Sequence, residues 1–308
     1  MASRTRLVIL NEDHSNPRHR AFALSVARAL RPLGYNVLGI ETLTGFADDQ
    51  EARAAMLQLT LQGYASPKSG TYLVDPVFGD FIRQSLALGY RPVAYESTTQ
   101  LVNGSMVERV EKREQDQAEN IRRRAFDAFP DGKVLIYVGF NHAMEKPAEI
   151  GPFKGVSWLA ERLHRITGID PLTIDQTALE ANNDPNFHSA YHADPKGKPR
   201  SFVNFIEGRP VVAGRYAGSV DLQVHHPVEV RRAGRPTWLA ELGRKRVPVP
   251  SHLLRTNEPR LVQIFMNRER NGIPVDQVLV QPGGSKPVLY APRQAFRIVS
   301  QSLHSKCP

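Results

Sequence analysis

Short hydrophobic runs alternate with segments of helical periodicity along the first 180 residues. The uninterrupted runs predict buried strands at 7–10, 35–40, 91–95, 133–138 and 172–175. Between them, apolar residues recur at helical spacing and predict helices at about 17–33, 48–62, 78–88, 105–125 and 158–166. Such alternation is typical of parallel strands joined by crossover helices. We therefore predict an α/β fold with a mostly parallel sheet of about five strands and flanking helices.

The pattern changes beyond about residue 180. Irregular segments rich in Asn, Asp and Pro give way to short β-like runs punctuated by proline. We expect two domains, an α/β domain at 1–180 and a β-rich region at 181–308 that packs on the sheet or covers its carboxyl edge.

Acidic, amide and histidine residues follow the predicted strands. They are Glu12, Asp13 and His14 after the first strand, Glu41 after the second, Glu96 after the third, and Asn141 and His142 after the fourth. The carboxyl ends of parallel strands share one edge of a sheet, where ligands bind in open α/β folds. Because the first strand-to-helix turn has carboxylates and an imidazole instead of phosphate-binding glycines, we expect acid/base or metal chemistry there.

The helix predicted from 105 has its own polar feature. Ser105 and Glu108 form a capping-box pattern at its start. Glu114 falls within the apolar stripe, where a buried carboxylate needs a partner, and Arg113 is the nearest candidate. Gln117 lies along the same flank as Arg113. The alternative is that Glu114 lies at the edge of the stripe and makes a surface salt bridge.

Four short motifs occur in order along residues 5–176: Glu12-Asp13-His14, Glu41, Arg113-Glu114 followed by Ala118-Glu119-Asn120-Ile121, and Gly139-Phe140-Asn141-His142. Together they resemble the superfamily that joins the erythromycin esterases, the Tiki/TraB-like proteins and the ChaN-like haem-binding proteins. The resemblance implies an α/β fold with a polar cleft at the carboxyl edge. In the esterase branch a histidine activates water, in the Tiki branch histidines and a glutamate bind a divalent metal for peptide hydrolysis, and the ChaN branch binds haem.

We therefore expect a hydrolase of ester or amide bonds, either metal-assisted or metal-free. The expected catalytic residues are His14, His142, Glu12, Glu41, Arg113 and Glu114, and the expected substrate-binding residues are Asp13, Glu96, Gln117 and Asn141. One histidine would take a proton from water, a glutamate would orient the imidazole, and Arg113 would stabilise the oxyanion.

Metal-assisted hydrolysis and haem binding are alternatives to metal-free hydrolysis. Mn, Fe or Zn would be held by His14, His142, Glu12 and Glu41. A haem- or metal-binding protein without catalysis is the second hypothesis, with Tyr95, His14 or His142 as axial ligand to haem.

Composition narrows the choice of partners. The net charge is +9, but the basic residues are dispersed, so we expect a small-molecule or peptide substrate and no nucleic acid. The single Cys307 excludes an internal disulfide. No apolar run is long enough for a membrane span, which predicts a cytoplasmic protein as written, or a periplasmic or exported one if a signal peptide has been removed. The sequence leaves the oligomeric state open.

Overall fold

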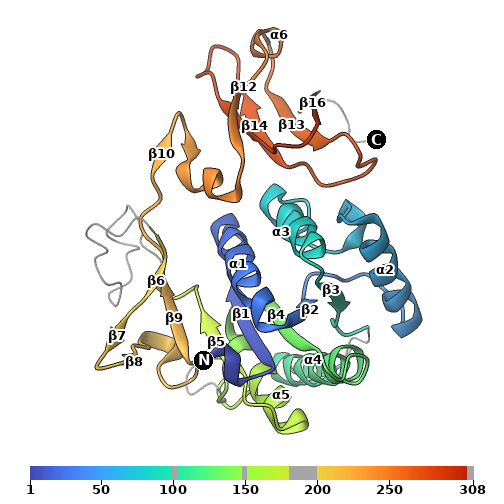
Figure 1. Cartoon of the computed structure of the whole chain (residues 1–308), viewed down its shortest axis with the longest axis vertical. Helices are drawn as coiled ribbons and strands as arrows, with labels where there is room; N and C mark the ends of the chain where they lie inside the picture. The colour runs from blue at the N-terminus through green and yellow to red at the C-terminus, as the bar shows by residue number, and fades with distance from the viewer. Residues whose placement is uncertain (99–102, 148–150, 180–199, 304–308) are drawn as a thin grey trace.

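A seven-stranded, mostly parallel sheet forms the centre of the computed structural model (Figure 1), which describes residues 1–98, 103–147, 151–179 and 200–303. The strands, in their order across the sheet, are β3 (Arg91–Ala94), β2 (Tyr35–Ile40), β4 (Lys133–Gly139), β1 (Leu7–Glu12), β5 (Leu172–Asp175), β9 (Leu222–His225) and β6 (Phe202–Val203). β6 is antiparallel to β9. The predicted α/β class is confirmed.

Helices cover both faces of this sheet. These helices are α1 (Pro17–Leu30), α2 (Asp49–Gln62), α3 (Pro76–Ala87), α4 (Met106–Ile121) and α5 (Leu159–Thr167), whereas the short α6 (Ser251–Leu254) packs with the C-terminal strands. On β1, Val8 and Leu10 pack in the core with α1 and α3, whereas Leu7 and Ile9 pack in the core with α4 and α5. Burial on both faces explains why the strand is continuously hydrophobic rather than alternating.

Short 3-10 and π-helical segments link these elements. The 3-10 segments are η1 (Ala2–Arg4), η2 (Arg31–Leu33), η3 (Pro67–Ser69), η5 (Phe140–Ala143), η7 (Gly214–Tyr216) and η8 (Thr237–Leu242), and η4 (Arg122–Phe126) is a π-helix that continues α4. Asn16 caps α1 with Pro17 at the first helical position, and Ser105 with Glu108 forms the predicted capping box on α4.

The sheet extends beyond the five predicted strands. β9 pairs in parallel with β5 through Ile174↔Leu222 and Asp175↔Gln223, so the β-rich half of the chain contributes two strands to it. This pairing joins residues about fifty positions apart, which a local hydrophobic pattern does not reveal.

The remaining strands form small antiparallel sheets. They are β13 (Arg260–Met266) between β14 (Asp276–Val280) and β16 (Phe296–Ser302), β12 (Lys245–Pro248) with β15 (Val288–Ala291), β7 (Phe205–Ile206) with β8 (Arg209–Pro210), and β10 (Arg231–Arg232) with β11 (Arg235–Pro236). The strands from β12 to β16 lie together at one end of the molecule, beside α3 (Figure 1). A bidentate ion pair from Arg83 of α3 to Glu269 fastens this end to the helical layer.

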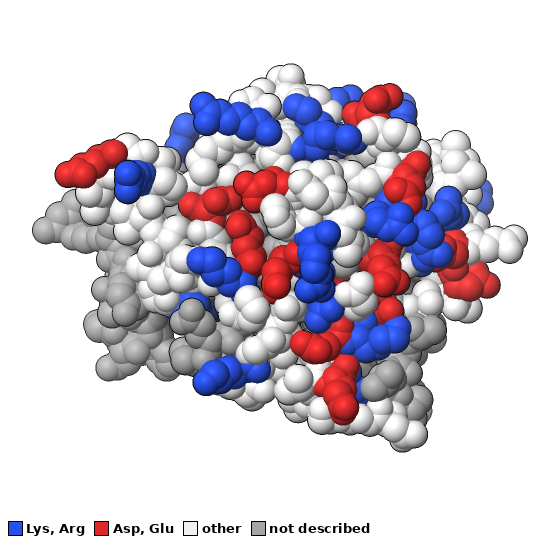
Figure 2. Space-filling model, turned by 90° about the horizontal axis from the view of Figure 1, so that it is seen from below, with Lys and Arg blue, Asp and Glu red and all other residues white. Residues whose placement is uncertain are grey.

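On the face shown in Figure 2, basic and acidic side chains are interspersed. None of the helices formed by the described residues combines the length and hydrophobicity that crossing a bilayer requires.

Candidate active site

The polar residues predicted at the strand ends converge at the carboxyl edge of the sheet. The parallel register places Glu12 of β1 directly opposite Gly139 of β4, and Glu41 follows β2 beside them. Glu41 and Gly139 line a pocket of about 340 Å³. Its lining includes His14, Glu41, Thr42, Thr44, Thr71, Tyr72, Glu96, Arg113, Gly139, Phe140 and His142.

Two histidines form matching pairs with buried glutamates. His14 Nδ1 lies 2.7 Å from Glu12 Oε1, and His142 Nδ1 lies 2.8 Å from Glu114 Oε2. Both glutamates are almost completely buried. A carboxylate on Nδ1 fixes the ring orientation and leaves Nε2 to face a reactant.

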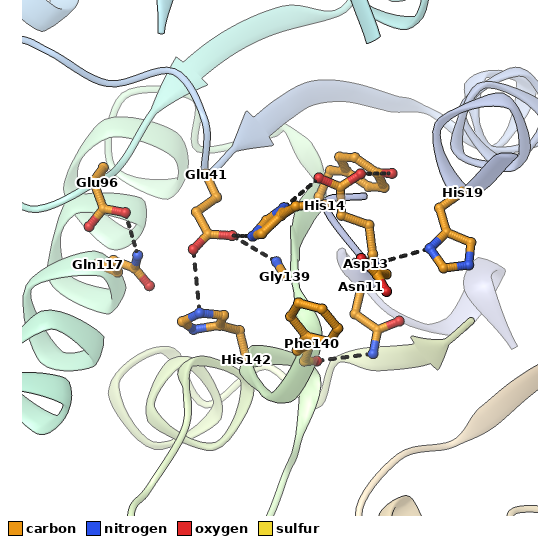
Figure 3. Close-up of polar contacts among 12 residues, drawn as sticks. Asn11, Asp13, His14, His19, Glu41, Glu96, Gln117, Gly139, Phe140 and His142 are labelled. Carbon is orange, nitrogen blue, oxygen red and sulfur yellow. Dashed lines mark hydrogen bonds and ion pairs between the residues drawn. The ribbon is translucent and has the colours of Figure 1, made fainter. Parts of the chain in front are cut away.

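Glu41 lies between the Nε2 atoms of the two histidines (Figure 3). Its Oε1 is 3.4 Å from His142 Nε2, and its Oε2 is 3.9 Å from His14 Nε2. Arg113 Nη2 donates to Oε1 at 2.6 Å and the Gly139 amide donates to Oε2 at 2.7 Å. Burial alone would raise the pKa of Glu41, but His142, Arg113 and His14 together lower it to about 2. Glu41 is therefore a fixed anion between two imidazoles.

The same surroundings act on His142. Burial alone would lower its pKa, but the carboxylates of Glu114 and Glu41 outweigh burial and raise the pKa. His142 therefore holds its proton to higher pH than a free imidazole does, and its protonated form can donate that proton.

Glu12 is held in turn by residues that the sequence did not identify. Arg20 Nε donates to Glu12 Oε2 at 3.0 Å, and the Tyr137 hydroxyl donates to the same oxygen at 2.7 Å. Arg20 lies on the apolar side of α1 and is only 2% exposed. An arginine within an otherwise apolar helical stripe is the signal that could have revealed it.

We expected from the sequence that Arg113 would pair with Glu114, but it does not. Its Nε donates to Glu96 Oε1 at 3.0 Å and its Nη2 to Glu41, while Glu114 is paired with His142. The expectation was wrong because adjacent helical residues point in different directions. Gln117, one turn further on the helix, also donates to Glu96, at 3.0 Å.

Of the four predicted substrate-binding residues, only Glu96 lines this pocket. The Asp13 carboxylate accepts hydrogen bonds from the amide and hydroxyl of Ser15, and the Asn141 side-chain oxygen accepts one from the Tyr216 hydroxyl at 3.2 Å. Neither of these two residues lines the pocket, and Gln117 is connected to it only through its hydrogen bond to Glu96.

Two aromatic side chains contact His14. Tyr72 stacks on its ring at 4.8 Å with an interplanar angle of 9°, and Phe140 meets it edge-on at 5.8 Å. Both have positive φ, 56° for Tyr72 and 35° for Phe140. Such backbone costs about 1–3 kcal/mol per residue and concentrates at functional sites. We found no signal in the sequence that predicts this pair.

The arrangement does not suit a metal ion as the side chains are placed. Both Glu41 oxygens already accept hydrogen bonds, one of them from a guanidinium whose positive charge opposes a cation. Within the ranges that the structure describes, no group of three or more His, Cys, Asp or Glu residues is arranged to hold a metal ion. Tyr95, considered above as a haem ligand, is fully buried and donates to the Tyr137 carbonyl.

No protein-family model matches this sequence, and no curated protein does. Among solved structures, the chain is similar to the type III effector HopBA1, with a TM-score of 0.39 and 12% identity over 73% of this chain and 89% of that one. It is also similar to RRSP, a MARTX toxin effector domain from Vibrio vulnificus, with a TM-score of 0.35 and 18% identity over 52% of this chain and 32% of that one. A structure described as bacterial protein toxins gives 0.38 and 18% over the same shares. The neighbours named here are bacterial effectors and toxins, and similarity this distant carries no argument about activity.

Proposed function

We propose that this protein hydrolyses ester or amide bonds with two histidines and needs no serine or cysteine nucleophile. The observation that supports the proposal best is the pair of His–Glu contacts, His14 with Glu12 and His142 with Glu114. Both histidines line one pocket, where their Nε2 atoms lie on either side of Glu41. When two titratable side chains in one site have different environments, one can act as the general acid and the other as the general base.

In the proposed mechanism, His14 Nε2 takes a proton from a water molecule as the water oxygen attacks the substrate carbonyl. His142, which starts protonated, gives its Nε2 proton to the leaving oxygen or nitrogen as that bond breaks. The products are a carboxylic acid and an alcohol or amine, and transfer of one proton from His14 to His142 through water restores both rings. Glu12, Glu114 and Glu41 stabilise whichever imidazolium is present.

Arg113 is the proposed donor to the oxyanion. Its Nε and Nη2 are occupied by Glu96 and Glu41, but its Nη1 has no hydrogen-bond partner among the described residues. Arg113 lines the pocket, and the two carboxylates fix the orientation of its guanidinium plane. Such a preorganised donor is worth more than a mobile one, because its reorientation is not needed during the reaction.

The test is hydrolysis of a panel of carboxyl esters and unstructured peptides by wild-type protein, by His14→Ala and by His142→Asn. We expect each variant to fold and to lose about 10²–10⁴-fold in kcat/KM. His164→Ala is the matched control, because His164 is a half-exposed histidine of α5 outside the pocket. Full activity in His14→Ala would contradict the proposal.

Metal dependence is tested in the same assay. We expect activity to survive a chelator and elemental analysis of the purified protein to find no stoichiometric Mn, Fe or Zn. Activity that a chelator removes and a single metal restores would instead support metal-assisted hydrolysis. A bound metal with no turnover on any substrate, or a Soret band on haem titration without turnover, would support the binding-protein alternative.

A further inference from the structure

A second concave site lies between α2 and the edge strand β3, away from the histidines. Its volume is about 420 Å³, within the range of small-molecule pockets. It shares no lining residue with the candidate active site. The groove borders Arg91 to Ala94 of β3, and the candidate active site includes Glu96, which follows that strand. We call it the α2 groove, and its apolar lining includes Ala52, Met56, Leu57, Val93 and Phe129.

Three arginines accompany this apolar lining. Arg53 and Arg91 are exposed, and neither has a carboxylate partner within the residues that the structure describes. Arg91 lies over the Phe129 ring at 5.0 Å. The groove therefore combines apolar walls with two positive charges that nothing in the described protein neutralises.

The third arginine is buried. Arg124 is 6% exposed, its Nη1 donates to the Ala94 carbonyl at 2.7 Å, and its Nη2 pairs with Asp49. Its Nε is buried and, among the described residues, has no hydrogen-bond partner. A buried donor without a partner is costly, and this one belongs to a residue that lines the groove.

A peptide strand is a poor occupant of this edge. Pro92 has no N–H to offer a neighbouring strand, and the Ala94 carbonyl is already used by Arg124. Strand addition needs free main-chain groups, so the side chains of the groove must provide the recognition.

We propose that the α2 groove binds a small amphiphile with one anionic head group, of the fatty-acid type. The apolar body lies against Met56, Leu57 and Phe129, and the carboxylate contacts Arg53 and Arg91. Guanidinium groups suit carboxylates because they offer two parallel N–H donors. This site is independent of the proposed hydrolase activity.

The experiment is calorimetric titration of the full chain with decanoate, decan-1-ol and decyltrimethylammonium. We expect saturable binding of decanoate at one site, with the alcohol at least about tenfold weaker and the cation weaker still, since each lacks the charged hydrogen bonds. His14→Ala should bind decanoate like the wild type.

Two pairs of variants locate the site. Leu57→Glu should abolish decanoate binding, whereas Leu61→Glu, one helical turn on and outside the groove, should not; both leucines are exposed, so both variants should fold. Arg53→Gln with Arg91→Gln should weaken binding about tenfold or more, and Arg122→Gln should not. The proposal is overturned if decanoate does not bind, if the alcohol or the cation binds equally well, or if Leu61→Glu loses binding as Leu57→Glu does.

Discussion

Gly139 shows how little space the candidate active site leaves around its reacting atoms. A Cβ at this position would lie 2.6 Å from His14 Nε2 and 3.2 Å from Glu41 Oε2. The glycine has φ −81°, a conformation open to any residue, so its role is to leave room rather than to allow an unusual backbone.

Gly139→Ala should therefore inactivate the protein without unfolding it. The added methyl group displaces the His14 ring, and a displacement of about 1 Å can cost roughly 10²-fold in rate. The measurements are kcat/KM on the best substrate of the panel and the midpoint of thermal unfolding. A variant that keeps full activity would show that His14 Nε2 does not need its present position.

Glu114→Gln tests whether His142 is the general acid. The amide keeps the size of the side chain but removes the negative charge that helps raise the pKa of His142, so that pKa should fall. If protonated His142 is the acid, the alkaline limb of the pH profile of kcat/KM must move to lower pH. NMR titration of the His142 ring measures the pKa directly, and an unmoved alkaline limb beside a lowered pKa would exclude His142 as the acid.

Among the elements, the junction of β5 with β9 contains a cluster of carboxyl groups. Thr173 of β5 donates its amide to Asp221 at 3.1 Å and its hydroxyl to Glu145. Burial raises the pKa of Glu145 to about 7, with Asp221 and Asp170 adding to the effect despite the hydrogen bond from Thr173. The pairing of β5 with β9 therefore lies next to Glu145, whose pKa is close to neutral pH.

This shift predicts how stability changes with pH. Because the pKa of Glu145 is higher in the folded state than in the unfolded state, its contribution is fully present below about pH 4 and is lost as the pH rises through about 7. The unfolding free energy from urea titrations should therefore fall between pH 5.5 and pH 8.5, and it should fall less in Glu145→Gln. An equal fall in both proteins would assign the pH dependence to other groups.

At the scale of the whole molecule, α3 joins the central sheet to the C-terminal strands. Ile273 packs so closely on Gly79 that a Cβ on the glycine would lie 2.6 Å from the Ile273 Cβ. Arg83 Nε and Nη2 donate to the two oxygens of Glu269 at 2.6 and 2.7 Å, and both side chains are largely buried. A bidentate pair in this setting fixes the orientation of one part against the other.

Glu269→Ala should lower the unfolding free energy by about 3–5 kcal/mol, because it leaves the Arg83 charge buried without its main partner. Arg122→Ala, which removes an exposed ion pair with Asp127, is the comparison and should cost about 1 kcal/mol or less. Urea unfolding followed by circular dichroism measures both. Equal costs would mean that the Arg83–Glu269 pair does not hold the two parts together.

The sequence by itself determined the central layers and the edge at which the polar residues gather. Hydrophobic runs and helix caps are local patterns. Glu12 and Gly139 end their strands and Glu41 follows its strand directly, so the parallel arrangement places all three at one edge.

Only the tertiary structure decided which charged groups pair. Glu114 belongs to His142, Arg113 to Glu41 and Glu96, and Glu12 to His14 and Arg20. The contact of Tyr72 with His14 and the pairing of β9 with β5 also became visible only there. The physical reason is that side-chain partners are selected by distances of a few ångströms between segments far apart in the chain, and hydrophobic periodicity contains no information about those distances.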